Sequence, residues 1–292
     1  MNKKVIKSYK AFDKDMKCRD FQYEVGKEYE MDGHIECCTR GFHACESPLE
    51  VFDHYDMLNS RFAEVEQSGT IDREEGSTKV CSSRIKIKAE LKLADIINIG
   101  VEWLKDITSP SNVKADGALN DNGDRKEQIG SSGDYAQIGS SGDYAQIGSS
   151  GYSAKIGSSG YSTKIGSSGY SAKIGSSGDY AKIGSSGESA QIGSSGESAQ
   201  IGSSGESAQI CSSGDYAKID STGEDSVIMC AGNNSKAKAK IGSWITLAEW
   251  KWSNEKNRYV PVCVKTEYVD GEKIKADTWY KLENGKFVEV NE

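Results

Sequence analysis

The chain has 292 residues, 36 of them lysine or arginine and 44 aspartate or glutamate, which gives a net charge of -8. This length leaves room for two or three domains, and the acidic balance argues against a general nucleic-acid binder, whose surface is basic. No apolar run reaches the roughly 20 residues that a membrane-spanning helix needs, and the polar start is unlike a signal peptide. We therefore expect a cytoplasmic protein with no membrane contact and no direct nucleic-acid binding. Its 8 cysteines suit a reducing compartment.

Residues 1–108 show the mixed pattern of a small α/β domain. The segment from Ser47 begins with Ser-Pro-x-Glu, which predicts a helix with a capping box in which Glu50 reaches back to the N-cap. An apolar helix is expected over 93–107. Three segments are expected to be strands: 5–12, 20–31 and 82–93.

Histidines and cysteines concentrate in this first domain, and such soft ligands could hold zinc. No C-x-x-C pair is present, so reduced, partly buried cysteines are favoured and no cofactor is expected. A Cys–His nucleophile pair is the alternative, but the sequence identifies no base, orienting group and oxyanion hole together. The weak metal candidates are Cys18, Cys38, His43 and Cys45.

The middle of the chain repeats nine residues almost without variation. Isoleucine recurs at this period from Ile129 to Ile228, in a unit that reads Ile-Gly-Ser-Ser-Gly-x-x-Ala-x. Alanine two residues before isoleucine places both side chains on one face of a short strand. Ser-Ser-Gly is typical of a turn, in which Gly133 and its equivalents are able to take positive φ. One such unit cannot bury its apolar face alone, so the units must stack.

Two units, 18 residues, suffice to enclose a thin core between two parallel sheets. The sequence therefore predicts a mainly β fold whose central β-solenoid spans 129–240, with isoleucine and alanine inside six coils. Residues 109–128 are expected to be a linker and a cap of the solenoid. A calcium-binding β-roll is disfavoured because the sixth position is not regularly aspartate, and a flexible linker would not keep an apolar register.

The variable sixth position of each unit carries the candidate binding residues. Residues 18 apart stack in a two-unit coil, so these positions form two columns, tyrosine-rich in the first half of the rod and acidic in the second. Like charges one strand apart are destabilising. The acidic columns therefore either protect solubility and sheet edges or bind a basic partner. The candidates are Glu188, Glu197, Glu206, Asp215 and Glu224 in the acidic half and Tyr152, Tyr161 and Tyr170 in the other half.

Residues 241–292 are expected to form an antiparallel β segment. Asp270-Gly271 and Asn284-Gly285 predict hairpin turns. About 50 residues are marginal for an independent core. The segment therefore either packs on residues 1–108, which we favour, or caps the rod.

Both flanks of the repeat resemble an uncharacterised family encoded by phages and prophages of gut bacteria. The resemblance rests on CRDFQYEVGKEYE, GFHACESPLEVFDHY and RFAEVEQSG in the N-terminal domain, and on GSWITLAEWKW and RYVPVCVKTEYVDGEKIKADTWYKL in the tail. It implies a phage-encoded protein in the host cytoplasm and supplies no catalytic residues. The glycine-phenylalanine pattern at Gly41 also resembles, more weakly, ADP-ribosyltransferase-like folds, but the arginine, Ser-Thr-Ser and glutamate set of such enzymes is missing.

These observations predict a non-enzymatic, phage-type interaction protein that binds a host factor, such as a defence component, through its repeat rod. The expected partner is a host protein with a basic surface, and homo-oligomer formation stays open. One alternative is a small enzyme of ADP-ribosyltransferase-like fold in residues 1–108, with the solenoid as a spacer. The other is a structural virion component, by analogy with the β-solenoids of phage fibres.

Overall fold

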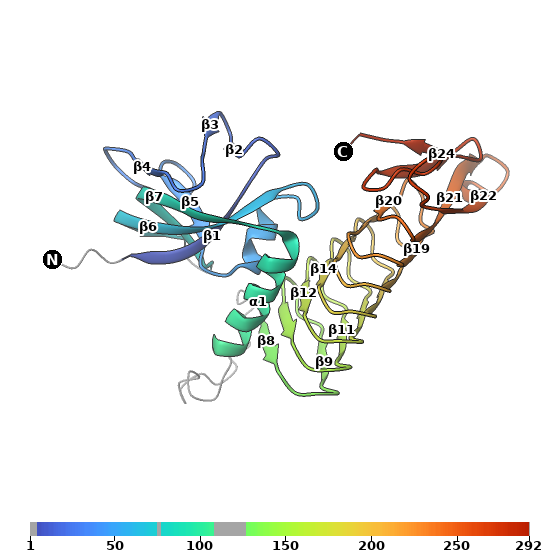
Figure 1. Ribbon diagram of the computed structural model, residues 1–292, viewed down its shortest axis with the longest axis horizontal. Coiled ribbons are helices and arrows are strands. Elements are labelled where there is room, and N and C mark those ends of the chain that lie inside the picture. The colour runs from blue at the N-terminus through green and yellow to red at the C-terminus, as the bar shows by residue number, and fades with distance from the viewer. Residues whose placement is uncertain (1–4, 75–76, 108–126, 292) are drawn as a thin grey trace. The chain divides into compact units, whose positions relative to one another are not determined.

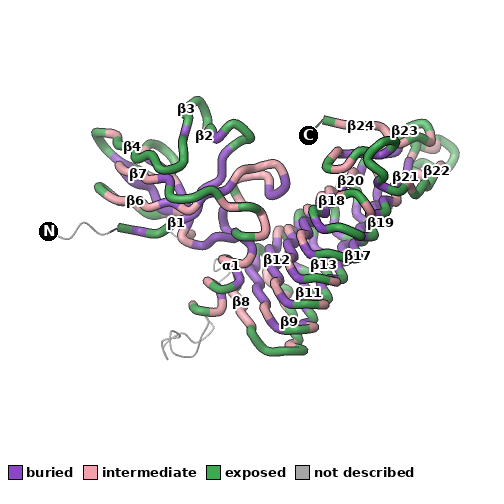
Figure 2. The backbone as a smooth tube through the Cα atoms, viewed as in Figure 1, coloured by how far each residue is buried: buried purple, intermediate pink, exposed green. Residues whose placement is uncertain are grey.

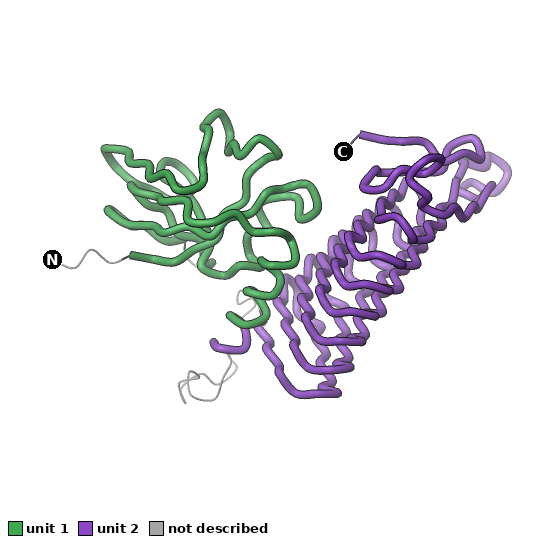
Figure 3. Tube along the Cα trace, viewed as in Figure 1, with its two compact units in different colours: residues 1–103, 114–125 green, residues 104–113, 126–292 purple. Residues whose placement is uncertain are grey.

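The computed structural model describes residues 5–74, 77–107 and 127–291 (Figure 1). The chain divides into two compact units: unit 1 consists mainly of residues 1–103, and unit 2 mainly of residues 126–292 (Figure 3). Strand makes up 48% of the structure and helix 8%, as the predicted mainly β class requires. No helix in the described ranges is long and apolar enough to cross a membrane. Most of the predicted linker and cap lies outside the described residues.

Unit 1 is built on a five-stranded antiparallel sheet with the order β4-β7-β5-β1-β6, and an additional β7–β6 pairing closes four of these strands into a ring. Its core contains the buried side chains of Phe12, Phe42, Val65 and Ile85. The chain between β1 and β4 forms a separate two-stranded sheet, β2-β3. The strands are β1 (Ile6–Phe12), β2 (Lys17–Cys18), β3 (Phe21–Gln22), β4 (Glu28–Glu30), β5 (Phe42–Cys45), β6 (Arg61–Arg73) and β7 (Lys79–Leu91).

Unit 1 also confirms one of the two predicted helices and corrects the other. The apolar helix is α1 (Leu93–Ile107). The segment after Ser47 forms instead a short 3₁₀ helix, η1 (Leu49–Asp53), with Pro48 at the N-cap and no side-chain cap. The predicted capping box was wrong because the buried Glu50 carboxylate accepts hydrogen bonds from Thr78, the residue before β7. A tertiary partner has replaced the local one.

The repeat folds into a two-sided β-solenoid of about seven turns over residues 128–247. Every strand pairs in parallel with the strand two units away, so Ile147 lies beside Ile165 and Ile165 beside Ile183. This register confirms the 18-residue coil with two nonapeptide units. The strands are β8 (Gln128–Ser131), β9 (Gln137–Ser140), β10 (Gln146–Ser149), β11 (Lys155–Ser158), β12 (Lys164–Ser167), β13 (Lys173–Ser176), β14 (Lys182–Ser185), β15 (Gln191–Ser194), β16 (Gln200–Ser203), β17 (Gln209–Ser212), β18 (Lys218–Ser221), β19 (Val227–Cys230) and β20 (Lys236–Ala239).

Isoleucine and alanine fill the interior of the rod, as predicted: Ile183 and Ala190 are fully buried. Buried and exposed residues alternate along the rungs of the eight-stranded sheet, whereas the rungs of the nine-stranded sheet are buried or half-buried throughout (Figure 2). Strands β8 to β16 read x-Ile-Gly-Ser, so a serine is their second inward residue. On the eight-stranded sheet, x and glycine face outward. Eight of the inward serine hydroxyls, among them that of Ser185, have no hydrogen-bond partner in the described residues.

Each turn of the rod depends on a glycine for a reason that differs from the prediction. The positive φ belongs to the seventh position of the unit, for example Tyr135 at 57° and Ser189 at 56°, and not to Gly133. Glycine is required at the fifth position because the coils approach closely there. A Cβ atom on Gly187 would lie 2.0 Å from the carbonyl oxygen of Gly169 in the preceding coil.

The C-terminal segment continues both sheets of the rod. Strand β21 (Trp244–Ser253) adds in parallel to β19, and β23 (Tyr280–Glu283) adds antiparallel to β20. Strands β20 and β21 supply the rungs beyond the nonapeptide pattern, so the predicted six coils were too few. Ile245 lies in the same apolar cluster as the isoleucines of the repeat. Packing of this segment on residues 1–108 stays a prediction.

Two further strands complete an antiparallel cap, and only one predicted hairpin turn is present in it. Strand β22 (Arg258–Tyr268) pairs with β21, and β24 (Lys286–Glu289) pairs with β23. Asn284-Gly285 joins β23 to β24 with both residues at positive φ. Asp270-Gly271 lies instead in the loop after β22, where the Asp270 carboxylate accepts three backbone N–H groups.

Candidate functional site

The five acidic candidates lie at exposed turns in two columns of the rod. Glu188, Glu206 and Glu224 belong to turns that lead into the eight-stranded sheet, and Glu197 and Asp215 to turns that lead out of it. Backbone hydrogen bonds fix the spacing, since Ser189 N donates to Glu206 O at 2.9 Å and Ser207 N donates to Glu224 O at 2.9 Å. Successive carboxylates in a column are therefore one strand layer apart, about 4.8 Å along the rod.

These carboxylates are not neutralised within the part of the chain that the structure describes. None of the five forms an ion pair there. Among the five carboxylates, only that of Asp215 accepts a hydrogen bond from a described residue: the backbone N–H of Asn233 donates to it at 2.7 Å. The two columns are hereafter called the acidic columns.

The three tyrosine candidates are members of two exposed ladders in the first half of the rod. Tyr152 and Tyr170 stack with ring centroids 5.4 Å apart and an interplanar angle of 4°. Tyr161 lies on the other edge, with Tyr144 at 5.8 Å and Tyr180 at 5.2 Å. The sequence pointed only to tyrosines at the sixth position of the unit. Tyrosines at the seventh position reach the same ladders, because that residue sits beside the sixth in the same turn.

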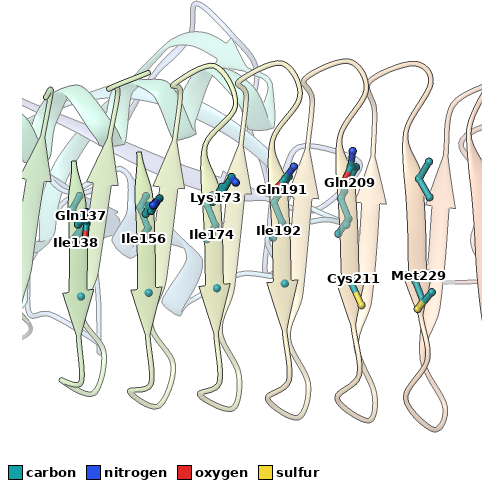
Figure 4. Close-up of a pocket in the computed structure, with 17 residues that line it drawn as sticks. Gln137, Ile138, Ile156, Lys173, Ile174, Gln191, Ile192, Gln209, Cys211 and Met229 are labelled. Carbon is teal, nitrogen blue, oxygen red and sulfur yellow. The ribbon is translucent and has the colours of Figure 1, made fainter. Parts of the chain in front are cut away.

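A groove of about 990 Å³ runs along the outer face of the eight-stranded sheet. Its floor is a column of glycines, Gly139, Gly157, Gly175 and Gly193, at each of which a Cβ atom would have nothing within 4 Å. Figure 4 shows Gln and Lys side chains along one side, and Cys211 and Met229 in place of glycine on the last two rungs. An outward glycine in a strand is destabilising by about 0.5–1 kcal/mol relative to alanine and often marks the close approach of another chain.

The groove was missed from sequence, although its signal is present there. Because Ile and the residue two positions later point inward, the glycine between them must point outward on every rung. The repeat therefore leaves a track, the row of outward glycines that forms the groove floor, at positions where most exposed strands carry side chains. The turns that carry Glu188 and Glu206 lead into β15 and β17, where glutamine rather than lysine lines the track.

A second cavity, of about 840 Å³, lies in unit 1. Lys10, from β1, is buried in its wall, where its Nζ atom donates to the backbone oxygen of His43 at 2.9 Å and lies 3.5 Å from the Cys18 sulfur. The Cys18 sulfur in turn contacts the Tyr55 hydroxyl at 3.0 Å. Burial lowers the pKa of Lys10 and raises that of Tyr55.

The weak metal candidates all line this cavity, but the structure does not gather them around one point. Cys18 lies beside Lys10, and Cys38 lies 3.1 Å from the Lys79 ammonium. Burial raises the pKa of Cys45 to about 12. His43 groups instead with two cysteines that the prediction left out, Cys37 and Cys81, within 4.8 Å.

This trio has the chemistry of neutral, reduced side chains. Burial raises the pKa of Cys81 to about 12 and also raises that of Cys37. The His43 Nε2 atom accepts a hydrogen bond from Cys38 N at 3.0 Å. Metal binding needs deprotonated thiols, and in the absence of an ion burial favours the protonated forms of Cys37 and Cys81.

Residues 6–99 match the model of a family described as a domain of unknown function (DUF7666). The match therefore lies within unit 1 and includes all of the cavity-lining residues, whereas the rod is outside it. No curated protein and no solved structure was found to match the chain. The match assigns no activity to the residues that it covers.

Proposed function

We propose that this chain is a non-enzymatic binding protein whose rod recognises a partner with a basic surface. The observation that supports the proposal is the pair of acidic columns, exposed and without ion pairs in the described residues. Carboxylates stacked one layer apart repel one another and lower stability. A rod that needed only solubility could place lysines beside its acids, as it does where Lys173 and Lys182 flank Asp179 in the sequence.

The groove adds to this proposal a surface on which an extended segment of the partner could lie. Glu188 and Glu206 lie in the turns that lead into β15 and β17, two strands that line the track. An extended basic segment that lies in the track and continues over these turns would bring its side chains to the carboxylates. A fixed acidic surface also speeds the encounter with a basic partner in a salt-dependent way. A rigid repeat presents such a surface without any active site.

The partner that we propose is a host protein, because the flanking segments resemble proteins encoded by phages and prophages. In that setting the binding would take place in the host cytoplasm, and a defence component is the partner that a phage protein would most usefully engage. The structure and the family match leave the enzyme and virion alternatives as predictions.

The proposal is tested by removing one acidic column. The triple variant Glu188→Gln, Glu206→Gln, Glu224→Gln should melt at or slightly above the wild-type temperature, because like-charge repulsion is relieved. Its capture of partner from host lysate should fall at least about tenfold at low salt, a loss of about 1.4 kcal/mol.

The matched control changes the same charge elsewhere, with Glu24, Glu255 and Glu272, all exposed, replaced by glutamine. It should capture partner as the wild type does. Equal losses in both variants, or no loss in the column variant, would overturn the proposal.

A further inference from the structure

The cavity of unit 1 is basic, although the chain as a whole carries a net charge of -8. Its volume of about 840 Å³ is in the range of small-molecule sites, about 300–1,000 Å³. Asp20 is the one acidic residue that lines it. The basic lining residues are Lys10, Arg19, Arg40 and Lys79.

These cations are poorly neutralised in the described residues. Lys10 is 3% exposed and donates to a backbone oxygen, with no carboxylate partner. Arg19 forms no ion pair, and Arg40 donates to the backbone oxygen of Asp32. Lys79 has a single carboxylate, that of Glu74, at 3.6 Å. Lys10 is buried and Lys79 is half-buried, whereas Arg19 and Arg40 are exposed. A buried or half-buried cation without a close counter-ion is unfavourable, and an anionic ligand would supply the missing charge.

The same positive field acts on His43, which also lines the cavity. Burial, followed by the charges of Lys10, Lys79 and Arg19, lowers its pKa to about 4. All three cations therefore lie near enough to His43 to disfavour its protonated form.

Aromatic rings form another part of the lining. Phe21 is 45% exposed, and its ring packs edge-on against Tyr23 at 4.8 Å. Tyr23 and Phe42 continue the same aromatic wall at a centroid distance of 6.4 Å. An exposed ring backed by two others offers a flat surface on which a planar ligand ring can stack.

We propose that this cavity binds a small anionic ligand that carries a planar ring, the chemistry of a nucleotide. The phosphate groups would lie among Lys10, Arg19 and Lys79, and the ring against Phe21. This site is independent of the rod and of the partner proposed for it.

Calorimetric titration of the full-length protein tests the site with three probes: adenosine diphosphate, adenosine and inorganic pyrophosphate. Adenosine diphosphate should bind with a Kd below about 1 mM, and each half-ligand at least about tenfold more weakly. No binding of the diphosphate, or pyrophosphate binding as tightly as the nucleotide, would overturn the proposal.

Two exposed positions provide variants that leave the core untouched. Arg19→Gln and Phe21→Ala should each weaken binding of adenosine diphosphate about tenfold. The control is Lys88→Gln, which removes a cation that pairs with Glu66 outside the cavity, and it should bind as the wild type does. Unchanged affinity in both cavity variants would place the nucleotide elsewhere and contradict the site.

Discussion

The rod and unit 1 solve the problem of burial in opposite ways. In the rod every residue meets its counterpart 18 positions away, as Ile165 meets Ile183, so stability is a sum of nearly identical layers. In unit 1 each buried polar group has its own distant partner. Gln67, for example, accepts from Ser8 at 2.8 Å and donates to the backbone oxygen of Phe42 at 2.8 Å. The repeated contacts of the rod thus produce a regular outer surface, whereas the non-repeated contacts of unit 1 enclose a cavity.

The largest expected effect comes from placing a charge between the layers of the rod. Ile183→Asp buries an unpaired carboxylate at a fully buried position, and we expect a loss of about 4 kcal/mol or more in the free energy of unfolding. The control is Gln191→Asp at an exposed outward position of the next rung. Urea unfolding that gave both variants the same midpoint would show that Ile183 is not inside.

Two glycines of the rod differ in the space around them: Gly187 is closely packed and Gly193 is open. Gly187→Ala should lower stability by about 3 kcal/mol, because the new Cβ atom would lie 2.0 Å from the Gly169 oxygen. Gly193→Ala has nothing within 4 Å and should raise stability by about 0.5–1 kcal/mol. Thermal melting of the two variants checks both signs, and equal effects would refute the coil spacing.

Unit 1 should be sensitive where its polar network is fully paired. Gln67→Ala leaves Ser8 and the oxygens of Phe42 and Val80 without their partner, so we expect a loss of about 2–3 kcal/mol. Amide hydrogen exchange of β1 and β5 measures this loss of stability, and the melting temperature of the protein gives a second measurement. An unchanged exchange rate would show that the network contributes nothing.

A dependence on pH should also distinguish unit 1 from the rod. Burial and nearby cations lower the pKa of His43 to about 4 from the ordinary 6.5. The unfolded chain therefore binds this proton between pH 6.5 and about 4 while the folded chain does not. Unit 1 should lose stability as the pH falls through that window. His43→Gln should reduce the slope, whereas His34→Gln, at an exposed position, should keep it.

The smallest effect is expected from the inward serines of the rod. The Ser185 hydroxyl is buried and has no hydrogen-bond partner in the described residues. Ser185→Ala should therefore change stability by less than about 1 kcal/mol, in the stabilising direction, since an unpaired buried hydroxyl is unfavourable. A loss as large as that of Gln67→Ala would show that the rod, too, depends on specific polar contacts.

Periodicity explains why the rod was predictable and unit 1 was not. The recurrence of Ile and Ala was enough to predict the 18-residue coil and its interior. The turn was misassigned because close approach, and not positive φ, selects glycine at positions such as Gly187. In unit 1 the pattern around Glu50 predicted a local cap, but its partner Thr78 lies 28 residues away. A contact between residues so far apart in the sequence cannot be predicted from the local pattern around Glu50.

The candidate sites divide in the same way. The acidic columns followed from the repeat, because residues 18 apart must stack. The cavity of unit 1 could not be predicted, since Lys10, Cys18 and Tyr55 come from separate segments and meet only in the fold. The cysteines and histidine singled out from composition line it, but composition did not reveal its basic and aromatic walls.

The most direct test of the binding account is zero-length carbodiimide coupling of the captured complex, followed by mass spectrometry of the joined peptides. Carbodiimide links carboxylates only to amines in contact with them. The account predicts bonds from Glu188, Glu206 or Glu224 to lysines of the partner, and their loss in the glutamine triple variant. Links confined to acids outside the acidic columns, unchanged in that variant, would contradict it.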